Sequence, residues 1–169
     1  ILDVDCNSAC YSIAISADGK YLVTGDYNYV NTYELSSITD TYSHKWQKHL
    51  YRYIRDIDIS ADGQFFAVIV GRETEKGLYY FSFDSSTPLW EGKPTPVSEW
   101  DTVSMSDNGR IVVGTRDYSQ TTYVYSWEYA SNSFLKQFAP ANNSLVNTNV
   151  SLMWTAAGED AKDWVYDVY

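Results

Sequence analysis

The sequence has little of the residues that mark several common classes of protein. Among 169 residues it has two cysteines, two histidines and four prolines, too few for a disulfide framework or a proline-rich linker. No apolar run approaches the ~18–20 residues that a membrane-spanning helix needs, and no basic-then-apolar leader opens the chain. We therefore expect a folded chain that does not span a membrane and that is either processed or excerpted from a longer one.

Positive charge is scarce as well. The 12 lysine and arginine residues stand against 22 aspartates and glutamates, which gives a formal net charge of −10, and no basic cluster interrupts this excess. An acidic surface repels the phosphates of nucleic acids and of anionic lipids. We expect no nucleic-acid partner.

Aromatic residues, in contrast, are abundant. They make up 17% of the chain and include 16 tyrosines and six tryptophans. Such residues favour strands, because they pack well on a half-buried pleated surface. No segment of useful length combines helical i, i+3, i+4 apolar spacing with helix caps. The sequence therefore predicts an all-β fold.

A short turn motif recurs along the chain. Its copies read SADG at residues 16–19, SADG at 60–63, SDNG at 106–109 and, in weaker form, TAAG at 155–158. The glycines are 44, 46 and 49 residues apart. Asp-Gly and Asn-Gly between apolar runs signal a hairpin, because glycine adopts a positive φ without a steric cost. Four copies of one unit of about 45 residues fit the chain.

Each unit contains apolar, mostly alternating runs that predict four strands. The first strands are expected at 11–16, 57–60, 103–106 and 150–154, and the second strands at 21–23, 65–70 and 111–113. The third strands are expected at 31–35, 78–83 and 122–127, and the fourth strands at 45–47, 89–91 and 134–136. Four antiparallel strands in ~40–50 residues are typical of a β-propeller blade. The approximate units are 1–37, 38–84, 85–129 and 130–169.

The number of strands bears on how the array closes. With further strands at 1–5 and 164–169, the count is about fifteen, close to three and three-quarter blades, whereas propellers usually close with four to eight. We expect a partial propeller, a stretch of a larger ring, with a compact four-bladed ring as the alternative. Further blades of a longer chain, or assembly, would complete a partial ring.

The motif ISADGKYLVTG at residues 15–25, the tyrosine-rich third strand and PLWEGK at 88–93 resemble WD40-like and quinoprotein-like propeller repeats. The resemblance covers nearly the whole chain and implies a propeller scaffold. The Gly-His pair and the terminal Trp-Asp of true WD40 blades are missing, and Trp100-Asp101 falls at the wrong end of a strand. The quinoprotein cofactor needs a full ring and a dedicated floor, so the resemblance implies no cofactor for this chain.

Side chains that could carry chemistry have simpler explanations. Cys6 and Cys10 are close enough to pair across a loop, and a bridge and two free thiols are both open. His44 and His49 are five apart on one strand, which predicts opposite faces and no shared metal. The pairs Asp56 with Asp58, and Asp3 with Asp5, could bind calcium or act as acid and base, but alternating solvent-facing acids explain them as well.

Catalytic motifs are missing, so we expect a protein that is not an enzyme and uses no cofactor or metal. Binding is expected instead in the loops after the second strands, which mix charge with aromatic rings as interaction surfaces do. The candidate contact residues are Asp26, Tyr27, Arg72, Glu73, Arg116, Asp117 and Tyr118.

Two functional classes follow. The preferred one is a non-catalytic propeller that docks a protein or a glycan, and the alternative is a propeller segment of a larger quinoprotein-like or other cofactor-dependent enzyme. Asn142 and Asn149 each begin a glycosylation triplet. These triplets favour an extracellular or cell-surface setting.

Overall fold

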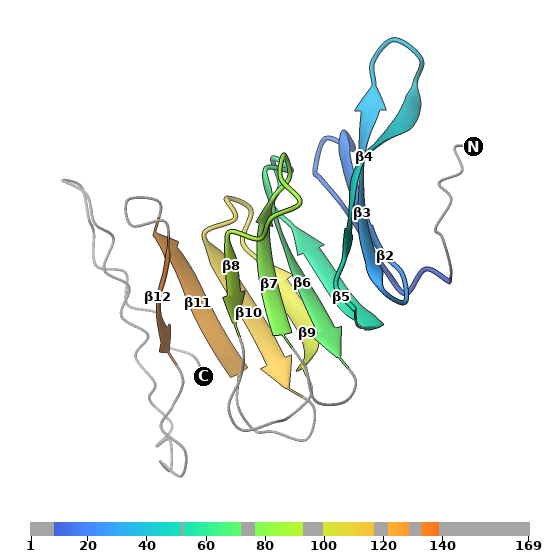
Figure 1. The fold of residues 1–169 in the computed structure, drawn as a ribbon. Coiled ribbons are helices and arrows are strands. Elements are labelled where there is room, and N and C mark those ends of the chain that lie inside the picture. Colours follow the sequence, from blue (N-terminus) through green and yellow to red (C-terminus); the bar gives the residue numbers. More distant parts are fainter. Residues whose placement is uncertain are drawn as a thin grey trace, which may run out of the picture. The chain divides into compact units, whose positions relative to one another are not determined.

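The structure is a computed structural model, and it describes residues 9–51, 53–71, 77–92, 100–116, 122–128 and 133–138. All of them belong to one compact unit, Ile1–Ala139; a second unit, Pro140–Tyr169, lies outside the described residues. The described residues form twelve strands and no helix (Figure 1). The prediction of an all-β fold is confirmed.

The strands form three antiparallel sheets, in which each strand pairs with its neighbours in sequence. The first sheet contains β1 (Ser12–Ile15), β2 (Tyr21–Gly25), β3 (Tyr29–Ser36) and β4 (Thr41–His49). The second contains β5 (Tyr53–Ile59), β6 (Phe65–Gly71), β7 (Gly77–Ser82) and β8 (Trp90–Gly92). The third contains β9 (Trp100–Met105), β10 (Ile111–Arg116), β11 (Thr122–Glu128) and β12 (Ser133–Phe138).

Each of these twelve strands coincides with a strand that the sequence predicts, within a few residues at the ends. The sheets differ from the predicted repeat units, because β4 pairs with β3 and so closes the first sheet, although the boundary at residue 37 separates them. The same offset holds for β8 and β12. The strands expected at 1–5, 150–154 and 164–169 and the fourth turn lie outside the described residues.

The recurring motif forms the turn between the first two strands of every sheet. In the first sheet, the Gly19 N–H donates to the Ser16 carbonyl at 2.9 Å, and the Ser16 hydroxyl donates to Asp18 Oδ1 at 2.7 Å. The N–H groups of Lys20 and Tyr21 donate to Asp18 Oδ1 and to Ser16 Oγ, both at 2.9 Å. The second and third turns repeat these bonds. The three turn glycines have φ angles of 73°, 71° and 70°, which explains why glycine stands there.

One apolar cluster joins the first sheet to the second. Val23 and Val30 contribute from the first sheet, and Ile54, Ile57 and Phe66 contribute from the second. All of them are at most 5% exposed. Because apolar area removed from water is the main stabilising term in folding, this cluster holds the two sheets together.

A second apolar cluster joins the second sheet to the third. Ala67, Ile69 and Leu78 point into it from the second sheet, opposite Trp100 and Val112 of the third. Successive residues of β6 thus point into different clusters, as the alternation of side chains along a strand requires. The second sheet is therefore covered on both faces.

Polar contacts link the first strands of successive sheets. The Ile57 N–H of β5 donates to Ser12 Oγ of β1 at 3.0 Å. One repeat further on, the Val103 N–H of β9 donates to Asp56 Oδ2 of β5 at 2.8 Å. Ser12 and Asp56 are 44 residues apart, as are the first two turn glycines, so the same contact occurs twice.

Two further links follow the repeat. The Met105 N–H donates to Asp58 Oδ2 at 2.7 Å. Between the turns, the Ala17 N–H donates to the Ala61 carbonyl at 2.9 Å, and the Ala61 N–H donates to the Asp107 carbonyl at 2.8 Å. The sheets are therefore related by a repeated contact pattern as well as by sequence.

Candidate functional site

The loops predicted to bind a partner follow β2, β6 and β10. These strand ends pair with the starts of β1, β5 and β9, in the pairs Gly25 with Ser12, Gly71 with Tyr53, and Arg116 with Trp100. Each such loop therefore lies at the end of its sheet where the first strand begins. We call this the loop end; in the first sheet it is at the bottom of Figure 1.

Only part of the predicted contact set is described. Asp26 and Tyr27 lie in the turn after β2, and the backbone of Arg116 ends β10. Arg72, Glu73, Asp117 and Tyr118 lie outside the described residues, so their role as contacts stays a prediction.

Tyr27 belongs to a group of aromatic side chains that come from segments far apart in the sequence. The Tyr53 ring lies 4.4 Å from Tyr11 and 6.1 Å from Tyr27, between ring centroids. Tyr11 and Tyr27 are 44% and 47% exposed. Three separate segments, before β1, after β2 and at the start of β5, thus bring their rings together.

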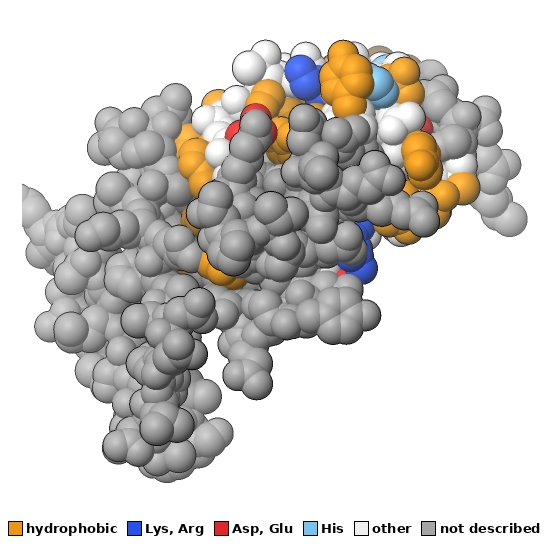
Figure 2. All heavy atoms as spheres, turned by 60° about the horizontal axis from the view of Figure 1, so that its bottom comes forward, with side chains coloured by type: hydrophobic (Ala, Val, Ile, Leu, Met, Phe, Trp, Pro, Cys, Tyr) orange, Lys and Arg blue, Asp and Glu red, His pale blue; other side chains and the backbone are white. Residues whose placement is uncertain are grey.

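A second group of rings lies at the same end of the first sheet, where β3 begins and β4 ends. His49, the last residue of β4, lies 4.6 Å from Tyr29 and 3.9 Å from Tyr51. Tyr51 is 69% exposed. We call Tyr11, Tyr27, Tyr29, His49, Tyr51 and Tyr53 the aromatic cluster. Figure 2 turns the bottom of Figure 1 toward the viewer, and hydrophobic side chains lie on the described part of this surface.

Asp26 builds the turn that presents two of these rings. Its Oδ1 accepts the N–H groups of Asn28 and Tyr29 at 2.9 and 2.7 Å, and its own N–H donates to the Tyr29 carbonyl at 2.9 Å. Such bonds from an aspartate to the next residues of the chain are typical of tight turns. Asp26 is 1% exposed, so it positions Tyr27 from below the surface.

The backbone at Tyr51 is strained. Its φ is 58°, and a bulky residue other than glycine is uncommon in this region because Cβ crowds the backbone. Strain of this kind concentrates at functional sites, where it persists because the surroundings enforce it. An exposed tyrosine held in this conformation is a reason, independent of composition, to consider the aromatic cluster functional.

The two histidines differ from the sequence prediction. His44 pairs with Tyr33 and His49 pairs with Tyr29, and these partners are four apart on β3, so both histidines share one face. The prediction of opposite faces was wrong because Lys45 is an extra residue that shifts the register of β4. They remain far apart along the strand, and among the described residues no group of three acids, histidines or cysteines is placed to hold a metal.

Asp56 and Asp58 are used structurally. Both are half-buried, and both accept backbone N–H groups of β9 in addition to the N–H of the residue that follows them. The acids are therefore neither free ligands nor solvent-facing side chains. Asp3 and Asp5 lie outside the described residues.

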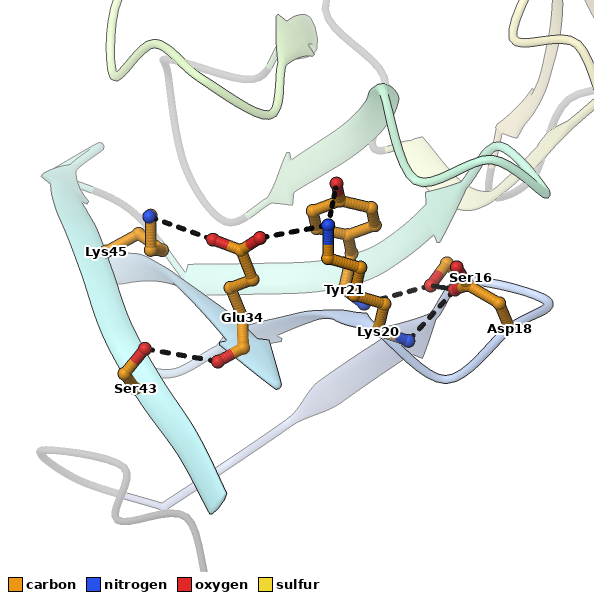
Figure 3. A network of polar contacts seen from close by, with 7 residues as sticks. All are labelled: Ser16, Asp18, Lys20, Tyr21, Glu34, Ser43 and Lys45. Carbon is orange, nitrogen blue, oxygen red and sulfur yellow. Dashed lines mark hydrogen bonds and ion pairs between the residues drawn. The ribbon is translucent and has the colours of Figure 1, made fainter. Parts of the chain in front are cut away.

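A second polar region lies at the opposite end of the first sheet. The Glu34 carboxylate pairs with Lys20 Nζ at 3.1 Å and with Lys45 Nζ at 2.9 Å, and Ser43 Oγ donates to the Glu34 carbonyl at 3.1 Å (Figure 3). The bonds from Lys45 and Lys20 lower the pKa of Glu34 below its ordinary value. Hydrogen bonds to Tyr21 and Glu34 raise the pKa of Lys20.

This charged triad borders an open hollow of about 460 Å³, which Ser36, Ser37 and Ile38 also line. Each Glu34 oxygen already has a lysine partner, and both lysine side chains are more than 40% exposed. Exposed ion pairs contribute little to stability, because water screens them. The hollow is therefore bordered by an exposed network in which the Glu34 oxygens and the two lysines bond one another.

Of the remaining predicted site residues, only Cys10 lies among the described residues. Cys10 is disulfide-bonded, and the chain has one other cysteine, Cys6, which lies outside the described residues. Asn142 and Asn149 also lie outside them. The described part of the chain contains no helix long and apolar enough to cross a membrane.

Comparison with known proteins gives a fold and no function. No protein family and no curated protein matches the chain. Among solved structures, it is similar to a functionally unknown protein from Desulfotomaculum acetoxidans DSM 771, with a TM-score of 0.64 and 16% identity. The match covers 84% of this chain and 43% of the other, so this chain spans less than half of that protein's length.

Proposed function

We propose that the three sheets are consecutive blades of a β-propeller and that the aromatic cluster is its docking surface for a protein partner. The observation that carries the proposal is the cluster itself: five tyrosines and a histidine gathered from separate segments at the loop end. Tyrosine supplies a large, rigid and amphipathic contact area at a low cost in conformational entropy, and it is enriched in binding interfaces.

The repeated contacts between sheets support the propeller part of the proposal. In a propeller, four-stranded sheets are arranged radially, so that each sheet packs face to face on the next one. The middle sheet here is covered on both faces, and the first strands of successive sheets are linked by Ser12, Asp56 and Asp58. Each of these features is what neighbouring blades require.

The ring angles favour a protein over a glycan. The Tyr53 ring is inclined at 57° to Tyr11 and at 77° to Tyr27, and His49 is inclined at 63° to Tyr51. Inclined rings leave notches between their edges instead of one flat platform. Protruding aliphatic or proline side chains fit between such rings, as in the aromatic-lined grooves that bind peptides.

The setting that fits this proposal is extracytoplasmic. Disulfides form and persist mainly in oxidising compartments, and Cys10 is disulfide-bonded. The triplets at Asn142 and Asn149 point the same way.

The proposal is tested by selecting peptides from a phage-displayed random library on the wild-type protein. The selected peptides are then measured against a Tyr27→Ser/Tyr51→Ser variant. We expect binding at least about tenfold weaker, or about 1.4 kcal/mol, because exposed aromatic anchors carry much of the energy of such interfaces.

The matched control is Ile38→Ser, which removes a side chain that is 93% exposed at the other end of the first sheet. It should leave peptide binding unchanged. Peptides that bind the tyrosine variant as well as the wild type, or a library that yields none, would contradict the proposal. A glycan array that binds through the same tyrosines, without any peptide, would show that the class of partner is wrong.

A further inference from the structure

The last strand of the first sheet, β4, differs from the rest of the chain in its charge. Residues 41–55 contain four of the 12 lysines and arginines and both histidines, and none of the 22 aspartates and glutamates. Within β4 the basic residues are His44, Lys45, Lys48 and His49. A strand of positive charge in a chain with a net charge of −10 is a local feature that the overall composition does not show.

β4 is also an edge strand. It comes last in the order β1-β2-β3-β4, and among the described residues it pairs only with β3. It has nine residues and is the longest described strand, whereas β8, the corresponding strand of the second sheet, has three. Five of its side chains are exposed, namely Thr41, Ser43, His44, Lys45 and Gln47. A long edge strand presents backbone groups with which another strand can pair.

The hydrogen bonds of β4 show which backbone groups point outward. The Leu50 N–H donates to the Asn28 carbonyl at 2.8 Å, so it points toward β3. The register with β3 then continues without a shift from His49 back to Trp46. Successive residues of an antiparallel strand direct their backbone groups alternately toward and away from the partner. The N–H and C=O groups of Gln47 and His49 therefore point away from β3, along the outer edge.

The two lysines of β4 lie on one face of the sheet. Lys48 pairs with Val30, which packs into the apolar cluster between the first two sheets. Lys45 reaches the Glu34 carboxylate on the same face, since Tyr21, the partner of Glu34 in β2, also packs on this cluster (Figure 3). Lys45 is thus paired, whereas Lys48 makes no ion pair with any described residue. Acidic side chains at alternate positions of an added strand would meet this face.

We propose that the outer edge of β4 binds an extended acidic peptide, which adds a strand antiparallel to β4. In strand addition of this kind, bonds between main chains supply the affinity and alternate side chains supply the specificity. The lysines also oppose pairing with a second copy, because two β4 edges would place like charges opposite each other. Charge therefore selects an acidic strand. The inference goes beyond the proposed function and uses the first sheet alone.

The probe is a capped peptide of about eight residues in which glutamate alternates with valine, a good strand former. In isothermal titration calorimetry, the chain should bind it at least about tenfold more tightly than a peptide that alternates lysine with valine. Lys48→Glu should weaken binding of the glutamate peptide at least about tenfold. The matched control is Arg110→Glu, which changes the net charge equally at an exposed position and should bind like the wild type.

Methylation of the peptide backbone separates strand pairing from charge attraction. Two further peptides carry N-methyl groups on the glutamates or on the valines, so each lacks the N–H donors of one edge. Because only one edge of an added strand faces β4, one of these peptides should bind at least about tenfold more weakly and the other like the parent. If both bind like the parent, charge alone explains the binding and the inference is overturned.

Amide hydrogen exchange locates the contact. In the free protein, the amides of Gln47 and His49 should exchange faster than that of Leu50, and the glutamate peptide should slow them. If they are already protected in the free protein, another segment of the chain occupies the edge and the inference is overturned. A glutamate peptide that does not bind also overturns it, because the lysines then only protect the edge. The Tyr27→Ser/Tyr51→Ser variant should bind this peptide like the wild type, so the two proposals fail separately.

Discussion

Alanine at the three turn glycines gives a graded test of how the sheets pack. All three have nearly the same positive φ, so each substitution incurs the same backbone cost, about 1–2 kcal/mol. They differ in what an added Cβ would meet. At Gly19 it meets nothing within 4 Å, at Gly109 it lies 3.0 Å from the Phe65 ring, and at Gly63 it lies 2.2 Å from the Tyr21 ring.

The contacts at Gly63 and Gly109 come from the preceding sheet, so they exist only if the sheets pack as described. Overfilling a packed contact costs roughly 1–3 kcal/mol. We therefore expect Gly19→Ala to lower the free energy of unfolding by about 1–2 kcal/mol and Gly63→Ala by about 3 kcal/mol, with Gly109→Ala between them.

Urea unfolding at pH 7 measures all three variants. If Tyr21 is also replaced by alanine, the Cβ added at Gly63 no longer meets a ring. In a double-mutant cycle, Gly63→Ala should therefore lower the free energy of unfolding by less in the Tyr21→Ala background than in the wild type. Equal losses for Gly19→Ala and Gly63→Ala would refute the packing of the turn on the neighbouring sheet.

Three further results are expected. Asp56→Ala should cost about 1–3 kcal/mol in urea unfolding by leaving a buried N–H without its acceptor, whereas Asp107→Ala should change stability by less than about 0.5 kcal/mol; equal effects would contradict the link between sheets. Because its lysine partners lower the pKa of Glu34, their stabilisation is present above the ordinary value of 4.5 and is lost as the pH falls through the lowered value. Glu34→Gln should therefore lose less stability than the wild type on acidification, by under about 1 kcal/mol because water screens these exposed pairs, measured as thermal midpoints at pH 7 and pH 3; a larger loss in the variant would contradict the network. Because Cys10 is disulfide-bonded, iodoacetamide should add no mass before reduction and two adducts after it, and labelling without reductant would contradict the bridge.

The repeated turns and strands could be predicted because their signals are local. Glycine at a positive φ and alternating apolar residues act within a few positions, so the motifs at 16–19, 60–63 and 106–109 predicted their hairpins correctly. The register of β4 could not be predicted in the same way. The extra residue at Lys45 is a property of the pairing with β3, and counting along one strand does not detect it.

The aromatic cluster was missed for a related reason. Tyr11 lies in a predicted strand, whereas Tyr29, Tyr51 and Tyr53 lie in the segments between predicted strands, and only the folded chain brings these tyrosines to one end of the sheets. Tyr27 was found because it stands in a loop. The roles of Asp56 and Asp58 also depend on the neighbouring sheet, whose backbone N–H groups turn two acids on one strand into links between strands.

The most direct test of the propeller is a crystal structure of the chain, examined at β1, β5 and β9. The account predicts that these three strands lie in succession, with Ser12 bonded to the Ile57 N–H and Asp56 bonded to the Val103 N–H. Sheets that instead pack as a two-layer sandwich, with β5 separated from β1 or β9, would contradict it.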